Sequence, residues 1–368
     1  MALTLILSHR ERGTFTSSEP CLRAYHVRTY KRPPHPARSR QRPSLTTIMQ
    51  RDRHSSRKDR NERLQANNDM DDHPFDWAEH WRMLVKDREA QAQRIRERTG
   101  LAQDSYWDER AEGFQRATQR YAGEPDRLLE MVSAHVTPET SVLDVGAGVG
   151  RYALPLARLA RQVIAVEPSE GMRGLMAANA AQQGIPNLTA VPARWEEAEV
   201  EPCDLALCSH VVYTVPDIRG FLEKLQRHTN NHCFMAIRTS QRGAHLQGLW
   251  KRVHGEERIP EPSLIELYNV LYQCLGVCAN VEVIPFRVGR SPLAAFDSLE
   301  DAVARVGSQL YLAEGAPQEA LVREHLEAHL VEREGRLVLP GPSVGAAIVW
   351  WDNGPESWNL MPRALPEG

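Results

Sequence analysis

A glycine-rich turn between two acidic residues is the part of the sequence best suited to holding a ligand. Residues 142–151 read V-L-D-V-G-A-G-V-G-R, with Asp144 in an apolar run and glycines at 146, 148 and 150. Glycine lets the backbone turn sharply and lets a ligand approach without a Cβ in the way. A second acid, Glu167, ends the next apolar run, and its two oxygens can accept both hydroxyls of a ribose. The pattern therefore predicts a site for a ribose-bearing cofactor.

Two cofactor classes fit such a turn, and the glycine spacing separates them. A dinucleotide fingerprint, G-x-G-x-x-G, that begins at Gly146 would need a small third residue where Arg151 stands. The spacing D-x-G-x-G-x-G instead resembles motif I of the class I S-adenosylmethionine-dependent methyltransferases, and within them it is similar to methyltransferase types 11 and 12. The resemblance implies that Asp144 lies beside the methionine amino group and that the loop from Gly146 to Gly150 lies under the cofactor.

Further motifs are similar to the same family. The Pro-Ser-x-x-Met stretch after Glu167 implies that Met172 lies near the adenine. Many relatives have an acid where Arg194 stands, and arginine cannot accept a hydrogen bond from the adenine amino group. Either Glu196 or backbone atoms take that contact, or the alignment is shifted. The predicted cofactor-binding residues are Asp144, Gly146, Ala147, Gly148, Gly150, Glu167, Pro168, Met172, Arg194, Trp195, Ser209 and Tyr106.

The end of the fourth apolar run supplies the candidate catalytic residues, His210 and Tyr213. Ligands of open α/β sheets bind beyond the carboxyl ends of the strands, so both side chains should face the acceptor. His210 is either a general base, since imidazole titrates near neutral pH, or a residue that shapes the pocket. Methyl transfer can proceed without a base when acceptor and sulfonium are held together. Pro202-Cys203 is similar to the nucleophile of cytosine-C5 RNA methyltransferases, but it begins the strand, so we interpret it as structural.

Alternating apolar runs and helical patterns predict the elements that position these residues. We expect strands over 141–145, 162–166, 188–191, 204–209 and 233–237, and helices over 149–159, 170–183 and 218–226. The remainder predicts helices over 263–277, 299–311 and 318–331, and strands over 281–288 and 345–351, with Trp350 and Trp351 on opposite faces. With the resemblance, this is an α/β, Rossmann-like, doubly wound, seven-stranded, mostly parallel sheet whose last strand is antiparallel. A helical N-terminal lid and C-terminal helical insertions complete it.

Four regions are expected along the chain. Residues 1–70 form a disordered basic segment, which is an arm for an anionic partner, a transit peptide or a mis-assigned start before Met49 or Met70. We favour the last of these. Residues 71–125 form a helical lid, in which Tyr106 and Arg110 close on the cofactor. Residues 126–352 form the methyltransferase domain, and residues 353–368 form a flexible tail.

Composition narrows the function. Hydrophobic residues make up 42% of the chain, the net charge is −3, and the six cysteines include no CxxC pair. We expect a cytoplasmic monomer or homodimer without a membrane or nucleic-acid partner, and without a metal, because His228-x-x-x-His232 has no third ligand nearby. The predicted reaction is direct displacement at the sulfonium methyl of S-adenosylmethionine by a small-molecule acceptor. The alternatives are an NAD-dependent oxidoreductase, which lacks an evident Tyr-x-x-x-Lys, and a non-catalytic cofactor- or nucleic-acid-binding protein.

Overall fold

The computed structural model describes residues 75–101, 111–120, 125–239, 246–285, 295–333, 335–340 and 345–353. The chain divides into two compact units, Met1–His73 and Pro74–Gly368, and every described residue lies in the second. The predicted basic segment 1–70, residue Tyr106 and residues 354–368 therefore lie outside the described part.

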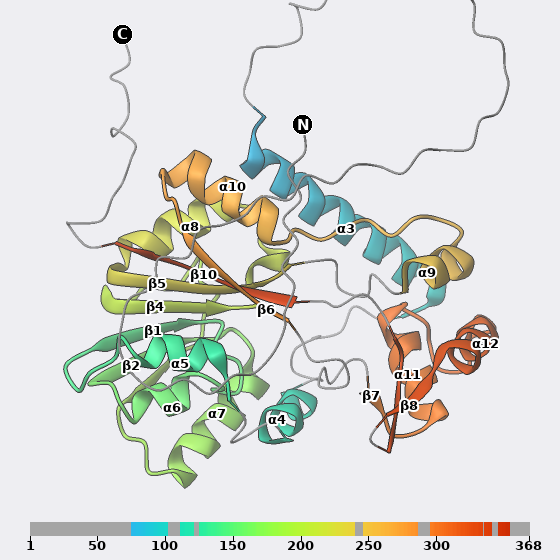
Figure 1. The fold of residues 1–368 in the computed structure, drawn as a ribbon, viewed down its shortest axis with the longest axis horizontal. Helices are drawn as coiled ribbons and strands as arrows, with labels where there is room; N and C mark the ends of the chain where they lie inside the picture. The colour runs from blue at the N-terminus through green and yellow to red at the C-terminus, as the bar shows by residue number, and fades with distance from the viewer. Residues whose placement is uncertain are drawn as a thin grey trace, which may run out of the picture. The chain divides into compact units, whose positions relative to one another are not determined.

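A seven-stranded sheet forms the centre of the described region (Figure 1). Its order is β3-β2-β1-β4-β5-β10-β6, the first five strands are parallel, and β10 runs antiparallel to both of its neighbours. The predicted fold class is thereby confirmed. The strands are β1 Ser141–Val145, β2 Gln162–Val166, β3 Leu188–Val191, β4 Cys203–Ser209, β5 Thr229–Arg238, β6 Asn280–Pro285 and β10 Gly345–Asp352.

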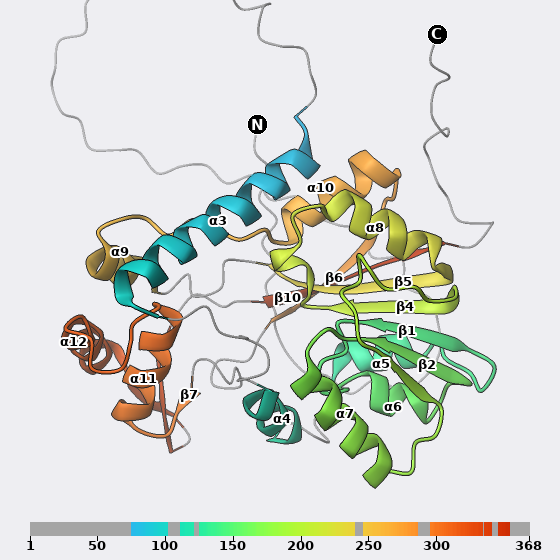
Figure 2. The ribbon, with the colours of Figure 1, turned by 180° about the vertical axis from the view of Figure 1, so that it is seen from behind.

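Helices cover both faces of this sheet, because alternate strand residues point to opposite sides. Helices α3, α8 and α10 lie on one face, and α5, α6 and α7 lie on the other (Figures 1 and 2). Leu143 packs toward the first group and Val142 toward the second, and Trp351 and Trp350 divide in the same way. The bounds are α3 Trp77–Thr99, α5 Arg127–Ser133, α6 Ala153–Ala157, α7 Glu170–Gln182, α8 Ile218–Arg227 and α10 Leu264–Leu275.

Helix α3 begins as the sequence indicates, with the Asp76 carboxylate accepting from the Glu79 N–H at 2.9 Å. Its Trp81 is fully buried in the same core as the sheet, and the indole N–H donates to the Val215 carbonyl at 2.8 Å. The N-terminal helical segment is therefore tied to the loop that follows β4. Helix α4, Ala111–Arg120, packs on α7 instead, and its Ala111 contacts the cluster containing Met172.

Beyond the sheet, the C-terminal insertion has a core of its own, around Trp250, Phe296 and Leu326. It contains α9 Gln247–His254, α11 Leu299–Gln309 and α12 Glu319–His329, with the last two close to the predicted bounds. It also contains a three-stranded antiparallel sheet that local sequence patterns did not predict. Its strands, in the order β7-β9-β8, are β7 Ala295–Phe296, β9 Arg336–Val338 and β8 Val331–Arg333.

Candidate cofactor and acceptor site

The glycine loop turns directly after β1 and is tied to the end of β2. The backbone N–H groups of Gly146 and Ala147 both donate to the Val166 carbonyl, at 2.8 and 3.2 Å. Gly146, Gly148 and Gly150 have φ values of 74°, 57° and 87°, a region that glycine enters without a Cβ penalty. This turn also delays the following helix, which begins at Ala153 and not at the predicted residue 149.

The three glycines serve different purposes. A Cβ at Gly146 would lie 2.3 Å from a Val211 methyl group, and one at Gly150 would lie 2.9 Å from the Leu154 and Met176 side chains. Packing therefore requires glycine at these two positions. A Cβ at Gly148 would meet no atom within 4 Å, so this glycine borders open space where a ligand could approach the backbone.

Glu167 follows β2 and holds the loop from the other side. Its carboxylate accepts from the Gly148 N–H and from the Ser169 N–H, both at 2.9 Å. A carboxylate has about four acceptor positions, so a group of this kind can bond several donors, ribose hydroxyls included. Pro168 is exposed beside it, whereas Met172 is buried against Ala111 on the first turn of α7.

Asp144 lies beneath the loop, with 1% of its surface exposed. Its Oδ2 atom has no hydrogen-bond partner in the described part of the chain, while the Ala153 backbone N–H supports the carboxylate. Burial, followed by the negative charge of Glu167, raises the pKa of Asp144 to about 7. A buried acceptor without a partner favours a cationic donor nearby. The open backbone at Gly148, this orphaned oxygen and Glu167 together fit an adenosyl cofactor that carries an ammonium group.

His210 and Tyr213 form a bonded pair at the carboxyl end of β4. His210 continues the ladder through its N–H, which donates to the Ala236 carbonyl at 2.9 Å, and it has a φ of 59°. That value is uncommon outside glycine, and such outliers cluster at functional sites. The His210 Nδ1 atom lies 2.8 Å from the Tyr213 hydroxyl, which also accepts from the Arg238 N–H at 2.9 Å.

Both members of this pair are uncharged at neutral pH. Burial, helped by the positive charges of Arg238 and Arg151, lowers the pKa of His210 to about 3. Burial raises the pKa of Tyr213 to about 12. An imidazole with so low a pKa is a weak base at pH 7. The geometry therefore favours the pocket-shaping interpretation of His210 over the general-base interpretation.

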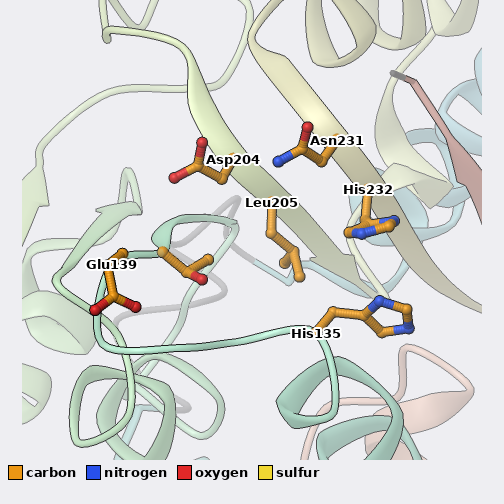
Figure 3. A pocket seen from close by; sticks show the side chains of 7 residues that line it. His135, Glu139, Asp204, Leu205, Asn231 and His232 are labelled. Carbon is orange, nitrogen blue, oxygen red and sulfur yellow. The ribbon is translucent and has the colours of Figure 1, made fainter. Parts of the chain in front are cut away.

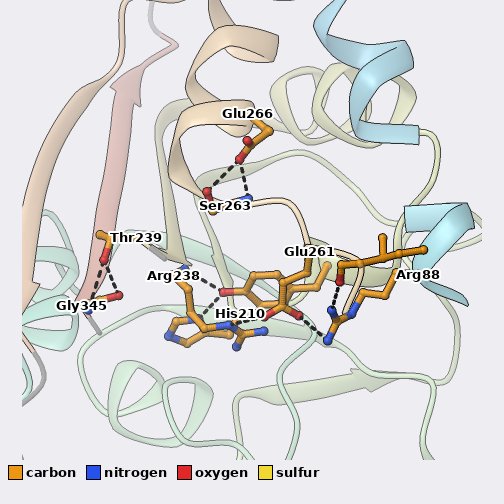
Figure 4. A network of polar contacts seen from close by, with 10 residues as sticks. Arg88, His210, Arg238, Thr239, Glu261, Ser263, Glu266 and Gly345 are labelled. Carbon is orange, nitrogen blue, oxygen red and sulfur yellow. Dashed lines mark hydrogen bonds and ion pairs between the residues drawn. The ribbon is translucent and has the colours of Figure 1, made fainter. Parts of the chain in front are cut away.

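A polar network joins this pair to helix α3 (Figure 4). The Arg238 guanidinium lies 3.6 Å from the centre of the Tyr213 ring, and its Nε lies 3.1 Å from Oε1 of Glu261. Arg88 of α3 lies 3.7 Å from the other Glu261 oxygen and donates to the Ile259 carbonyl at 2.7 Å. Sequence reasoning missed these residues. The one available signal was a charged residue, Arg238, at the end of a buried strand.

The other predicted site residues are distributed as follows. Ser209 ends β4 and is a polar neighbour of the Tyr152 hydroxyl. Arg194 is exposed after β3. Trp195 is buried in the core beside α8, where its indole N–H donates to the Phe221 carbonyl at 3.2 Å. The structure therefore brings together the loop, Glu167 and Asp144, but it directs the Trp195 ring into the core.

A pocket of about 260 Å³ lies at the opposite end of the strands from the glycine loop, near the amino ends of β1, β4 and β5 (Figure 3). The length of β1, about 17 Å, separates it from the glycine loop. Within the described ranges, no group of three or more histidine, cysteine, aspartate or glutamate residues could hold a metal ion. The pocket is lined by His135, Glu139, Thr140, Asp204, Leu205, Asn231 and His232.

The glycine loop, the strand-end acid and this strand order are the features that the resemblance to the class I methyltransferases predicts. In agreement, residues 142–232 match the family model described as a methyltransferase domain. The predicted resemblance is thereby confirmed, and S-adenosylmethionine is the co-substrate of this class. None of the described helices is long and apolar enough to cross a membrane.

The proteins to which this chain is similar do not identify its methyl acceptor. A Haemophilus influenzae protein of uncharacterized function is 29% identical over 204 residues, which are 54% of this chain and 72% of that protein. The 23S rRNA (uracil(1939)-C(5))-methyltransferase RlmD of Burkholderia thailandensis is 43% identical over 53 residues, 14% of this chain and 11% of that enzyme. The Synechocystis magnesium protoporphyrin IX methyltransferase, solved with bound S-adenosylhomocysteine, is 18% identical with a TM-score of 0.38, over 56% of this chain and 94% of that one.

Proposed function

We propose that this chain transfers the methyl group of S-adenosylmethionine to a small-molecule acceptor and releases S-adenosylhomocysteine. The observation that carries the proposal is the carboxylate of Glu167, which holds the Gly148 N–H at 2.9 Å beside an open stretch of backbone. Bound there, S-adenosylmethionine would supply an electrophilic methyl group on a sulfonium. Glu167 would hold the ribose, and the orphaned oxygen of Asp144 would favour the ammonium end.

Enclosure of the polar residues beyond β4 and β5 supports a small acceptor. Glu261 is buried, and Arg88 and Arg238 are largely covered in their ion pairs with it. Trp81 fixes helix α3 to the Val215 carbonyl close to Tyr213. Small-molecule sites are enclosed and have a few convergent polar groups, whereas a nucleic acid needs an open basic surface.

The residues of this site position and shield the reactants, since neither His210 nor Tyr213 readily accepts a proton at neutral pH. Holding an acceptor in line with a sulfonium methyl can contribute about 7–11 kcal/mol to lowering the barrier. Helix α4, whose Ala111 lies in one cluster with Val149 of the glycine loop, would exclude water from the loop, which strengthens the electrostatic interactions inside.

Calorimetry with S-adenosylhomocysteine tests the cofactor assignment. The variant Glu167→Gln keeps the size of the side chain but loses the charge, so we expect at least a tenfold loss of affinity. Glu170→Gln is the matched control, because Glu170 is exposed on the first turn of α7 and should bind as the wild type does. Equal affinity in all three proteins, or a preference for NADH, would remove the assignment.

A ribosomal RNA acceptor is the second candidate, favoured by the short matches to the rRNA enzymes. The chain spans only 11–28% of those proteins. Cys203, the one cysteine that the sequence suggested as a nucleophile, is buried at the amino end of β4. Incubation with tritiated S-adenosylmethionine and a cell extract should label the small-molecule fraction. Label confined to RNA would favour the second candidate.

A further inference from the structure

The Tyr213 hydroxyl contacts two partners, and one of them can only donate. The oxygen lies 2.9 Å from the Arg238 backbone nitrogen and 2.8 Å from Nδ1 of His210. The Arg238 N–H donates, so the hydroxyl oxygen accepts there. No third partner of this hydroxyl occurs among the described residues, so its own proton must point to Nδ1. Pointing it elsewhere would leave a buried donor unsatisfied, at a cost of about 1–3 kcal/mol.

A neutral imidazole carries one N–H, so an Nδ1 that accepts places the proton on Nε2. We infer that His210 presents Nε2–H to the methyl acceptor as a hydrogen-bond donor, and that the acceptor offers a carboxylate to it. The first half rests on the hydrogen bonds alone, and the second half also rests on the proposed function. The Nε2 atom has no hydrogen-bond partner within the part of the chain that the structure describes, and the ring is half-buried at the carboxyl edge of the sheet.

The charges around His210 favour an anion. Arg238 is paired with Glu261 at 3.1 Å, and Arg151 with Asp126 at 2.7 Å. A third guanidinium, that of Arg88, shares Glu261 with Arg238. Among these five described side chains, three carry a positive charge and two a negative charge. An N–H donor beside these guanidinium groups suits a carboxylate. When a carboxylate oxygen takes the methyl group, the sulfonium S–C bond breaks, an ester O–C bond forms, S-adenosylhomocysteine leaves, and no proton has to move to His210.

Nitrogen-15 NMR of histidine-labelled protein tests the tautomer directly. Two-bond proton–nitrogen spectra distinguish a protonated ring nitrogen from one with a lone pair. Loss of the His210 signals in the His210→Asn variant assigns them, because asparagine tolerates the left-handed backbone. The control is His329→Asn, on α12, which should leave these signals in place. We expect Nε2 protonated and Nδ1 unprotonated from pH 5.5 to 8. The opposite assignment would overturn the inference.

The variant Tyr213→Phe tests the source of the tautomer. It should move the Nδ1 resonance, because the lone pair loses its hydrogen bond, and an unchanged resonance would show that the hydroxyl does not donate.

The acceptor class is tested by release of S-adenosylhomocysteine with aliphatic, aromatic and amino acids and with their primary amides. Turnover confined to the acids supports the carboxylate. Equal turnover of the amides, or no turnover of any acid by protein that binds S-adenosylhomocysteine, overturns it. Failure to bind S-adenosylhomocysteine would remove the proposed function and leave the tautomer intact.

Discussion

Asp144 is the residue whose replacement should stabilise the protein most clearly. Its carboxyl group is almost fully buried, one oxygen has no partner among the described residues, and the charge of Glu167 lies nearby. These surroundings raise its pKa from 3.8 to about 7. Each pKa unit is worth 1.36 kcal/mol, so ionised Asp144 costs the folded state about 4 kcal/mol.

The sign of the effect follows from the two pKa values. Well below pH 3.8 the Asp144 carboxyl is protonated in both the folded and the unfolded chain, so its burial as an ion does not lower the stability of the protein there. Between pH 4 and 7 the unfolded chain loses the proton while the folded chain keeps it, so stability falls as pH rises. Above pH 7 both states are ionised, and the full penalty remains. The variant Asp144→Asn has no such penalty at any pH.

Urea unfolding of wild type and Asp144→Asn at several pH values measures this difference. The asparagine amide adds a donor that needs a partner, so the absolute stabilisation will be smaller than about 4 kcal/mol. The change with pH is the sharper readout: the advantage of the variant should grow by roughly 2–3 kcal/mol between pH 5 and 8. Asp204→Asn is the control, because burial is opposed there by hydrogen bonds from Ser141 that lower its pKa. A constant difference between Asp144→Asn and wild type would refute the reasoning.

The same argument links Asp144 to the cofactor. An ammonium group beside the carboxylate would favour the ionised form and release a proton on binding. Calorimetry of S-adenosylhomocysteine binding at pH 6, in two buffers of different ionisation enthalpy, should show proton release by the wild type. Asp144→Asn should show less. Equal release by both proteins would place the ammonium elsewhere.

Three further outcomes are expected. Gly150→Ala should lose about 2–4 kcal/mol of stability, because its φ of 87° is unfavourable for alanine and the new Cβ meets packed side chains. Gly148→Ala should lose only about 1–2 kcal/mol of stability but should bind S-adenosylhomocysteine more weakly. A larger loss of stability for Gly148→Ala than for Gly150→Ala in urea unfolding would contradict this. Trp81→Phe should cost about 2–3 kcal/mol, since the Val215 carbonyl loses its donor, and a loss below about 0.5 kcal/mol would show that α3 does not depend on this bond. The pH profile of methyl transfer should lack an inflection near pH 6.5 from His210; such an inflection, if His210→Asn removed it, would restore the general base.

Local sequence patterns predicted the sheet well, for a physical reason. Buried parallel strands need apolar residues on both faces, as in Val142 and Leu143 on opposite faces of β1. The glycine loop and Glu167 were equally predictable. Backbone N–H groups of the loop and the carboxylate at the end of β2 form the part of the site that we propose for the cofactor. Both depend on residues close together in the sequence.

Other features gave no local signal. Strands of two or three residues, such as Ala295–Phe296, are too short to show a period of two, so the small antiparallel sheet was missed. Trp195 was assigned to the cofactor by its position after the third strand, yet its ring lies in the core beneath α8. A large aromatic side chain in a turn can point either way, and tertiary packing decides which.

The polar network that we propose to border the acceptor could not be predicted, because three separate segments build it through side chains. Arg88 comes from α3, Glu261 from the segment before α10, and Arg238 from the end of β5. Each residue alone resembles an ordinary surface charge, and only the fold brings the three together around one carboxylate. Because Arg238 also lies against Tyr213, any change at Glu261 should reach His210 through that ring. Under the proposed function, the acceptor preference would therefore depend on long-range packing, whereas the residues proposed to bind the co-substrate lie in one short stretch of sequence.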